Sequence, residues 1–261
     1  MNTLRRFSFR PALCLLLLAS TLCHAQVNKT PPAAPLIAPF IIVSGDLPPF
    51  AFANQAQSPG VAVEIAEALA QKLHYPVKVQ FFPWARALAM AQSQKRVMIL
   101  ALTRIPERED QYHWLVPIAS QAYLFITHNK RHAPVQTMAD AKTVTIGVLR
   151  GSPTLQHLLK NQFSEKRILP HASVENGLKA LDSGIIDSYY GGELIAKNTM
   201  QSSGRHLQDY HFGLTLERGD LWLGGSKDFD QHDLDAIARA YDELKSEGTY
   251  ARLLKKYLLL E

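Results

Sequence analysis

Apolar residues follow two different spacings along the chain after about residue 40. The continuous apolar run at 40–43 and the alternating apolar residues of 77–81 are typical of strands. Between them, the apolar residues of 64–73 recur every three or four positions, which indicates a helix with one buried face. Strands that alternate with helices in this way predict an α/β fold in which helices cover a parallel sheet.

The same alternation continues to the end of the chain. It predicts helices over 84–92, 154–161, 174–181, 234–244 and 250–258, and strands over 97–102, 123–127, 143–148 and 185–190. A helix, a short turn and a strand at 87–102 recur at 178–190, which fits two similar lobes. Every α/β protein repeats such units, so the recurrence alone leaves one lobe or two open.

The first 25 residues have a different pattern. A basic start is followed by the apolar stretch 12–22 and by small residues at the −3 and −1 positions of a cleavage site after Ala25. These features are typical of a secretory signal peptide, whose apolar part is too short to span a membrane stably. We therefore expect export to the periplasm, with an uncleaved membrane anchor as the alternative. Residues 26–39 hold clustered prolines, which predict an extended linker.

Composition and charge narrow the possible functions. The chain is 47% hydrophobic and 20% charged, which suffices for a large core. The first 25 residues contain three arginines and no acidic residue, so their removal lowers the net charge from +5 by three to +2, and the remaining charges are of mixed sign. Nucleic-acid binding is therefore disfavoured. Both cysteines, Cys14 and Cys23, also lie in this segment, so we expect neither thiol chemistry nor disulfides in the processed chain.

Motifs for several other chemistries are missing from the sequence. Nine histidines remain once His24 is removed, and none has the spacing of a metal site. There is no glycine-rich phosphate loop and no G-x-S-x-G nucleophile turn. We expect no metal and no cofactor.

An ordered set of short motifs resembles one known family. The motifs are SGDLPPFAF at 44–52, FFPWARAL at 81–88, ALTRIPERED at 101–110, VTIGVLRGSP at 144–153, ALDSGIIDSYY at 180–190 and DELKSEGTYARLLKKY at 242–257. In this order they resemble the bacterial extracellular solute-binding proteins of family 3, the periplasmic receptors of polar amino-acid ABC transporters. The resemblance implies a two-lobed periplasmic-binding-protein type II fold with a ligand cleft between the lobes. Lobe 1 would comprise 40–122 and 221–261, and lobe 2 would comprise 123–220.

Arg108 is the main candidate for ligand binding that the resemblance implies. The family places an arginine there to bind a ligand carboxylate, and a guanidinium forms a planar, bidentate pair with that group. Thr103 would donate its backbone N–H or its hydroxyl to the same carboxylate. The alternative is an ion pair of Arg108 with Glu107 or Asp110 on a solvated turn.

The PWARA segment and the loop before it supply further candidates in lobe 1. Trp84 would form a wall of the cleft, although filling the core is nearly as good an interpretation. Arg86 is a second possible anion ligand. Phe50 is a candidate for a second wall, and Asp46 is a candidate contact for a cationic group.

Lobe 2 contributes a turn and one aromatic candidate. Arg150, Gly151 and Ser152 follow the strand at 143–148, where Ser152 would cap a helix and Gly151 would let the backbone approach an anion. Tyr190 is a candidate contact for the ligand. The family's amino-acid binders hold the ligand ammonium with an acidic residue where this chain has Gly192, so a standard α-amino acid is in doubt.

The function that follows is capture of a small carboxylate-bearing solute by a monomer without catalytic activity. Closure around the solute would let the protein dock on a membrane permease of an ABC transporter or on a sensor. The alternatives are an enzyme on the same scaffold, similar to a dehydratase, and a receptor component that senses the ligand. An enzyme would need a titratable group in the cleft, for which Glu193 and Asp46 are the candidates.

Overall fold

The computed structural model describes residues 35–258, which belong to one compact unit. The strands are β1 (Ile41–Ser44), β2 (Val79–Phe81), β3 (Val97–Thr103), β4 (His113–His128), β5 (Ile146–Leu149), β6 (Ile168–His171), β7 (Ser188–Gly192) and β8 (Tyr210–Gly225). The α-helices are α1 (Val61–Lys72), α2 (Trp84–Ser93), α3 (Met138–Thr143), α4 (Thr154–Lys160), α5 (Val174–Ser183), α6 (Glu193–Ser202), α7 (Gln231–Ser246) and α8 (Thr249–Leu258). None of these described helices is both long and apolar enough to cross a membrane.

All eight strands belong to one mixed sheet with the order β2-β1-β3-β8-β4-β7-β5-β6. The two longest strands, β4 and β8, have 16 residues each and pair antiparallel from His113 opposite Gly225 to His128 opposite Tyr210. The outer strands pair parallel with each other, as expected for βαβ units. The prediction of a parallel sheet is therefore wrong for the centre, where β8 pairs antiparallel with β3 and β4, and β4 pairs antiparallel with β7.

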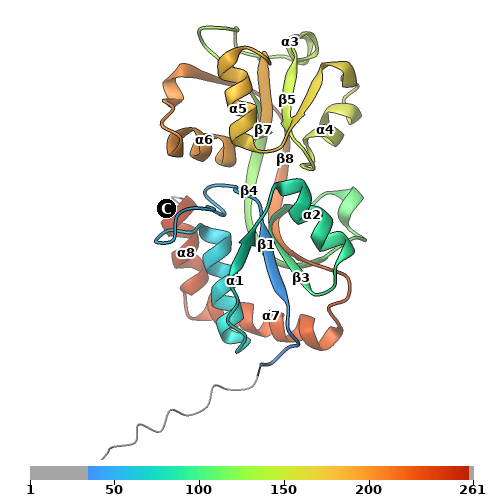
Figure 1. Ribbon diagram of the computed structural model, residues 1–261, viewed down its shortest axis with the longest axis vertical. Coiled ribbons are helices and arrows are strands. Elements are labelled where there is room, and N and C mark those ends of the chain that lie inside the picture. Colours follow the sequence, from blue (N-terminus) through green and yellow to red (C-terminus); the bar gives the residue numbers. More distant parts are fainter. Residues whose placement is uncertain (1–34, 259–261) are drawn as a thin grey trace, which may run out of the picture. The chain divides into compact units, whose positions relative to one another are not determined.

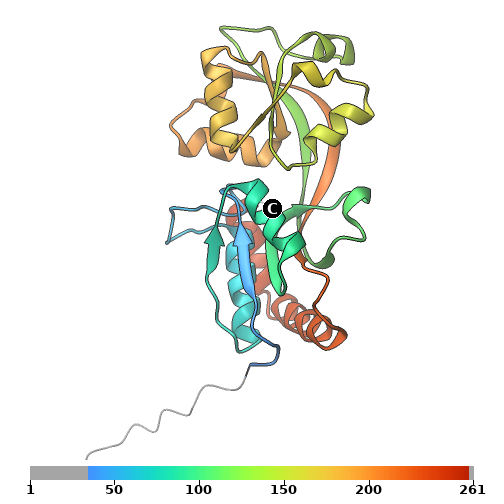
Figure 2. The same cartoon turned by 45° about the vertical axis from the view of Figure 1, so that its right-hand side comes forward.

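The paired strands β4 and β8 carry a separate group of elements at each end. β3 pairs with the last residues of β8, Leu221–Gly225, whereas β7 pairs with Tyr123–Ile126 of β4. We call β1–β3 with α1, α2, α7 and α8 the first lobe, and β5–β7 with α3–α6 the second lobe. Figures 1 and 2 show β4 and β8 running from one group to the other. The chain thus has the two lobes that the family resemblance implies.

The helices of the first lobe form where the apolar spacing predicts them. The buried residues of α1 repeat at helical spacing from Val61 to Ala70. α7 begins with a capping box, in which Asp230 accepts a hydrogen bond from the backbone N–H of Asp233 and the Asp233 side chain reaches back to Asp230. Asp233 also forms an ion pair with Arg96 at 2.7 Å, which ties α7 to the residue before β3.

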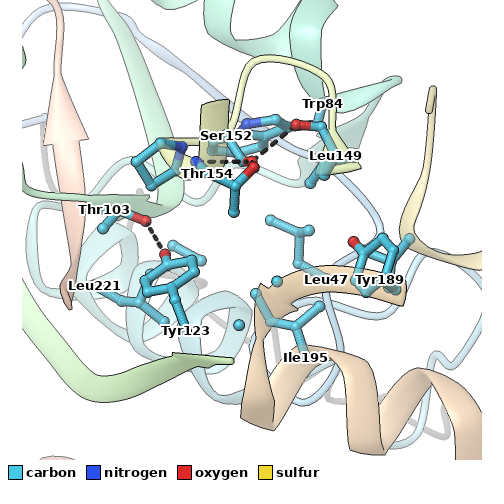
Figure 3. Close-up of a pocket in the computed structure, with 15 residues that line it drawn as sticks. Leu47, Trp84, Thr103, Tyr123, Leu149, Ser152, Thr154, Tyr189, Ile195 and Leu221 are labelled. Atoms are coloured by element: carbon cyan, nitrogen blue, oxygen red, sulfur yellow. Dashed lines mark hydrogen bonds between the residues drawn. The ribbon is translucent and has the colours of Figure 1, made fainter. Parts of the chain in front are cut away.

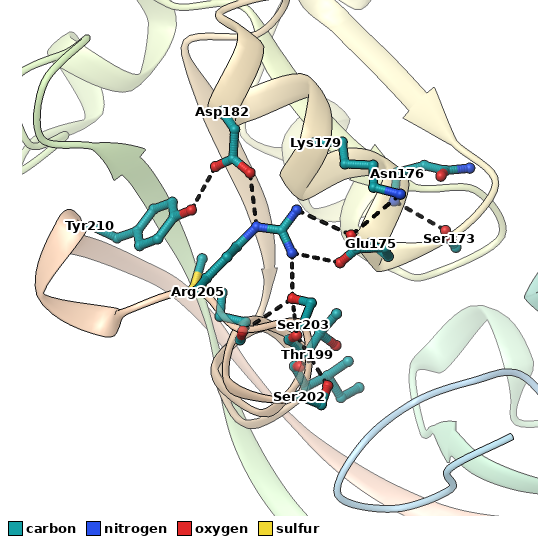
Figure 4. Close-up of polar contacts among 12 residues, drawn as sticks. Ser173, Glu175, Asn176, Lys179, Asp182, Thr199, Ser202, Ser203, Arg205 and Tyr210 are labelled. Atoms are coloured by element: carbon teal, nitrogen blue, oxygen red, sulfur yellow. Dashed lines mark hydrogen bonds and ion pairs between the residues drawn. The ribbon is translucent and has the colours of Figure 1, made fainter. Parts of the chain in front are cut away.

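The second lobe is tied together by a polar cluster around Arg205. The Arg205 guanidinium donates to Glu175 at 2.7 Å and to Asp182 at 2.8 Å, which lie at opposite ends of α5. The Tyr210 hydroxyl donates to Asp182 at 2.6 Å. Figure 4 shows Arg205 between these two carboxylates. The cluster fixes the start of β8 against α5.

Several elements differ from the sequence expectations. Strands β6 and β8 and helices α3 and α6 were not predicted, and β4 begins ten residues before the expected 123–127. The strand expected over 143–148 begins at Ile146, because Thr137 caps a short helix that lasts until Thr143. The proposed signal peptide over 1–25 lies outside the described residues. Residues 26–34 of the expected linker also lie outside the described residues, and in its described remainder Ile37 is buried and the Leu36 N–H donates to the Leu73 carbonyl.

Candidate functional site

A small cavity lies between the two lobes. Its lining comes from both lobes and from both crossing strands: Leu47, Trp84, Ala101, Thr103, Tyr123, Leu149, Ser152, Pro153, Thr154, Val174, Tyr189, Gly191, Gly192, Ile195 and Leu221. Its volume is about 30 Å³, which is room for about two waters. Figure 3 shows Thr103 and Tyr123 on one side of this space, with Tyr189 and Ile195 across from them. Many of these residues follow strand ends or begin helices, where α/β proteins bind ligands.

A second cavity adjoins the first and is larger, at about 280 Å³. Leu47, Trp84, Leu149 and Val174 line both cavities, so the Trp84 side chain lies at the boundary between them. Asp46 lines the second cavity, where its carboxylate accepts a hydrogen bond from the Ala53 N–H at 3.0 Å. Together the two cavities offer space for a solute larger than the first cavity alone would hold.

Arg108 lies next to the first cavity and connects the two lobes. It ends the 3-10 helix Pro106–Arg108 and is only 7% exposed. Its guanidinium donates to the carbonyl of Thr103 in the first lobe at 3.1 Å and to the carbonyl of Gly151 in the second lobe at 2.8 Å. It forms no ion pair with any carboxylate of the described residues, and burial lowers its pKa. The alternative pairing with Glu107 or Asp110 is therefore not observed.

Hydroxyl groups make up one polar part of the lining. The Thr103 and Tyr123 hydroxyls are 2.7 Å apart and share a hydrogen bond. Burial raises the pKa of Tyr123, and the neighbouring Thr103 and Gln121 side chains oppose this rise. Across the lobes, the Ser152 and Thr154 hydroxyls are 2.6 Å apart. These groups are neutral donors and acceptors.

Two buried side chains at or behind the cavity lining have polar atoms without a hydrogen-bond partner of ordinary geometry in the described structure. They are Trp84, whose indole N–H belongs to a lining residue, and Gln121, which is 2% exposed and lies behind the lining residue Gly192. The Gln121 amide lies against Gly192, where a β-carbon would come within 2.4 Å of the amide oxygen. The amide therefore fills the space into which a side chain at position 192 would project.

Glycines hold the Tyr189 ring in place. A β-carbon at Gly177 or at Gly191 would each lie 2.5 Å from a carbon of the ring, on opposite edges. Burial raises the pKa of Tyr189 well above its usual range, so the hydroxyl stays protonated. The ring is thus a rigid, neutral wall of the cavity.

Three of the expected site residues line the first cavity, and three others lie beside it. Trp84, Thr103 and Ser152 are part of its lining. Gly151 and Arg108 lie behind them and line a separate surface depression, and Asp46 lines the adjoining second cavity.

The remaining four expected residues lie elsewhere. Phe50 is fully buried in the core of the first lobe and lines neither cavity. Tyr190 is also fully buried, and its hydroxyl lies 3.2 Å from His157 Nδ1. It faces away from the cavity that Tyr189 lines, because adjacent residues of a strand face opposite sides of the sheet. Arg86 is exposed and lies over the Phe82 ring, and Arg150 is exposed. The structure does not bring these four side chains to the first cavity.

The sequence analysis did not list the polar residues of β4 and β7 that lie at the cavity or behind its lining: Gln121, Tyr123 and Tyr189. Gln121 and Tyr123 are two residues apart on β4, so they face the same side of the sheet. Tyr189 is the neighbour of the tyrosine that was expected there. A sequence prediction of a strand beginning near residue 113 would have placed the side chains of Gln121 and Tyr123 on the same face of the sheet.

The described residues contain one group of potential metal ligands, Asp230, His232 and Asp233. It lies at the start of α7 and outside the cavity lining. Both carboxylates are already used, in the helix cap and in the ion pair with Arg96. The arrangement is accounted for by the structure of α7.

Comparison with known proteins identifies similar sequences. The bacterial extracellular solute-binding proteins, family 3, match residues 40–260. The probable amino-acid-binding protein YxeM of Bacillus subtilis is 24% identical over 218 residues, which cover 82% of this chain and 81% of YxeM. The histidine-binding periplasmic protein of Salmonella typhimurium is 24% identical over 222 residues, or 80% of this chain and 83% of that protein.

Solved structures with the same fold include proteins of different roles. A histidine kinase sensor domain with similarity to periplasmic binding proteins has a TM-score of 0.74 at 16% identity, over 84% of this chain and 96% of the domain. The substrate-binding protein of an ABC uptake transporter from Streptococcus pneumoniae, solved with bound histidine, has a TM-score of 0.73 at 20% identity. The match covers 83% of this chain and 91% of that protein. At these identities the likeness concerns the fold alone.

Proposed function

The chain belongs to the bacterial extracellular solute-binding proteins of family 3, and from this premise we propose that it captures a small carboxylate-bearing solute between its lobes. The solute would occupy the cavity at β4 and β8 and extend toward the adjoining cavity at Trp84. The loaded protein would then dock on a membrane permease of an ABC transporter or on a membrane sensor.

The observation that carries this proposal is the environment of Arg108. A buried charge without a partner is costly, and two carbonyl oxygens compensate a guanidinium only in part. A ligand carboxylate beside Thr103 would supply the missing negative charge and a bidentate hydrogen-bond geometry. Arg108 lies behind the lining residue Thr103, and we propose that its charge meets the solute when the lobes separate.

Capture requires the lobes to separate further than in this structure. The first cavity is too small for an amino acid or a comparable solute. Two contacts between the lobes limit it: the hydrogen bond from Arg108 to the Gly151 carbonyl and the packing of Gly151 against Ala85 of α2. We propose that a solute carboxylate replaces the Gly151 carbonyl at Arg108 and that the lobes close again around the solute.

The lobe boundaries and the export route belong to the same proposal. We place the boundaries in β4 near 122–123 and in β8 near 220–221, because β7 and β3 pair beyond these points. Export through a signal peptide cleaved after Ala25 agrees with the extracellular or periplasmic location in the names of the family and of the Salmonella relative. We propose that the processed chain acts as a monomer.

We also propose that the protein binds without catalysing a reaction. The family and the relatives named above are binding proteins. Among the described residues that line the first cavity there is no carboxylate and no histidine to transfer a proton. Glu193, a candidate for such a role, forms an ion pair with Lys197 at 2.6 Å.

Thermal unfolding and calorimetry of the processed chain, residues 26–261, test the proposal. The panel contains small carboxylates, the carboxamide analogue of each, amino acids, polyamines and short peptides. We expect carboxylates to raise the melting temperature and to bind more tightly than their carboxamides. Binding of the carboxamides as tightly as the acids would contradict the role of Arg108, and the absence of any binding would contradict solute capture.

A further inference from the structure

We infer that the cavity selects carboxylates that carry no ammonium group, and that Gln121 determines this selection. The inference rests on the proposed function, because it names the class of solute that the same site takes. It assigns a role to a residue that belongs to none of the sequence motifs above.

The described part of the cavity offers no negative charge for an ammonium group. None of the residues that line the first cavity is acidic. Asp46 lines the adjoining cavity instead, where it is exposed and accepts the Ala53 N–H. The buried cation of Arg108, which donates to the carbonyl of the lining residue Thr103, would repel an ammonium group. A buried ammonium would therefore lack compensation.

The Gln121 amide lies behind the cavity lining, in the space into which a side chain at Gly192 would project. Its oxygen and nitrogen would lie 2.4 and 2.5 Å from a β-carbon at Gly192, so no side chain fits there while the amide holds its position. Both amide atoms are buried and, although the Tyr123 hydroxyl is close, neither has a hydrogen-bond partner of ordinary geometry. Such groups are costly to leave unpaired, so a bound solute that pairs with them gains affinity. An amide pairs with neutral donors and acceptors and adds no charge.

Two other polar groups of the lining fit the same kind of solute. The Trp84 indole N–H is a donor without a partner, and the Tyr189 hydroxyl is a donor or an acceptor. Both belong to aromatic rings that give flat apolar walls. The complementary solute is a monocarboxylate with hydroxyl or keto oxygens and an apolar remainder. A 2-hydroxy or 2-oxo acid meets this description, whereas the amino acid with the same carbon skeleton does not.

Matched solutes test this inference on the unaltered chain. The probes are L-leucine against 2-hydroxy-4-methylpentanoate and 4-methyl-2-oxopentanoate, and L-phenylalanine against 3-phenyllactate. We expect the hydroxy or oxo acid of a pair to bind about tenfold or more tightly than the amino acid, by calorimetry. If the amino acids bind equally well or better, the inference is overturned and solute capture stands. If only polyamines or peptides bind, the inference is overturned as well, and if no probe binds, the proposed function fails with it.

The variant Gln121→Glu tests the residue itself. Glutamate has nearly the shape of glutamine and brings a carboxylate to the cavity without a clash at Gly192. We expect the preference to shift by about tenfold or more toward the amino acid of each pair. Gln201→Glu, an equal change of charge on the exposed surface of α6, should leave the preference unchanged. An unaltered preference in a folded Gln121→Glu protein would contradict the role of Gln121. The comparison of solutes on the unaltered chain decides the matter if the variant does not fold.

Discussion

Two arginines in different parts of the molecule have opposite electrostatic surroundings. Arg205 in the second lobe bonds to two carboxylates, Glu175 and Asp182, and these contacts raise its pKa against the effect of burial (Figure 4). Arg108 beside the cavity bonds to two carbonyl oxygens, and burial lowers its pKa. Both guanidiniums are shielded from solvent, yet of the two only Arg205 has carboxylate partners among residues 35–258.

The difference separates a structural arginine from one that is kept for a ligand. Arg205 completes a set of hydrogen bonds that joins α5 to the start of β8, and nothing further is needed to satisfy it. Arg108 holds a charge that the described residues leave uncompensated at the boundary between the lobes. Since unpaired buried charges destabilise a fold, the position of Arg108 supports our proposal that an anion arrives with the solute.

Removal of the Arg108 charge should have the largest effect. We expect Arg108→Met to weaken carboxylate binding by about 2–5 kcal/mol, because a buried charge pair loses one partner. The unfolding free energy of the unliganded protein should stay the same or rise, since the uncompensated charge is gone. Calorimetry and thermal unfolding measure the two quantities.

Arg108→Lys is the matched control for this variant. It keeps the positive charge but loses the planar pair of donors, so we expect affinity between those of the unaltered chain and Arg108→Met. Equal affinity in all three proteins would show that the guanidinium does not touch the solute.

The corresponding change at Arg205 should act on stability and not on binding. We expect Arg205→Met to lower the free energy of unfolding by about 1–3 kcal/mol, because charge-assisted hydrogen bonds to two partly exposed carboxylates are lost. Chemical denaturation measures the change. Lys179→Met, which removes a more exposed partner of Glu175, should cost about 0.5 kcal/mol or less. A loss of affinity in Arg205→Met with unchanged stability would contradict the division between the two arginines.

Much of the fold was predictable from local patterns, and the failures have physical causes. Helices with a strong apolar spacing, such as α1 and α7, begin and end within about three residues of the expected bounds. β8 was missed because it crosses between the lobes and is partly exposed, with Glu217, Arg218 and Asp220 along it. A strand that is not buried on one face lacks the alternation that identifies strands.

The site was predictable only where a motif lies at the end of a strand or the start of a helix. Trp84, Thr103 and Ser152 are residues of this kind, and they line the cavity. Tyr190 was expected at the cavity, but Tyr189 lines it. A difference of one residue on a strand reverses the face of the sheet, so the expectation failed. Gln121 has no motif, and its significance depends on Gly192, a residue distant in the chain that lies against its amide.

The smallest expected effect concerns a third buried basic group, His157 of the second lobe. Burial lowers its pKa, as it does for Arg108, but a histidine can avoid the cost by losing its proton. The unfolded chain then binds more protons than the folded chain as the pH falls below about 6.5, so the folded state loses stability there. One proton limits the change of the unfolding free energy to at most about 1.4 kcal/mol per pH unit.

We expect His157→Gln to flatten the dependence of the unfolding free energy on pH between about pH 6.5 and pH 5, measured by denaturation at a series of pH values. His206→Gln, on the exposed surface, should leave this dependence unchanged. An identical slope in both variants would mean that His157 does not resist protonation, and that the burial which leaves Arg108 uncompensated does not extend to this neighbouring group.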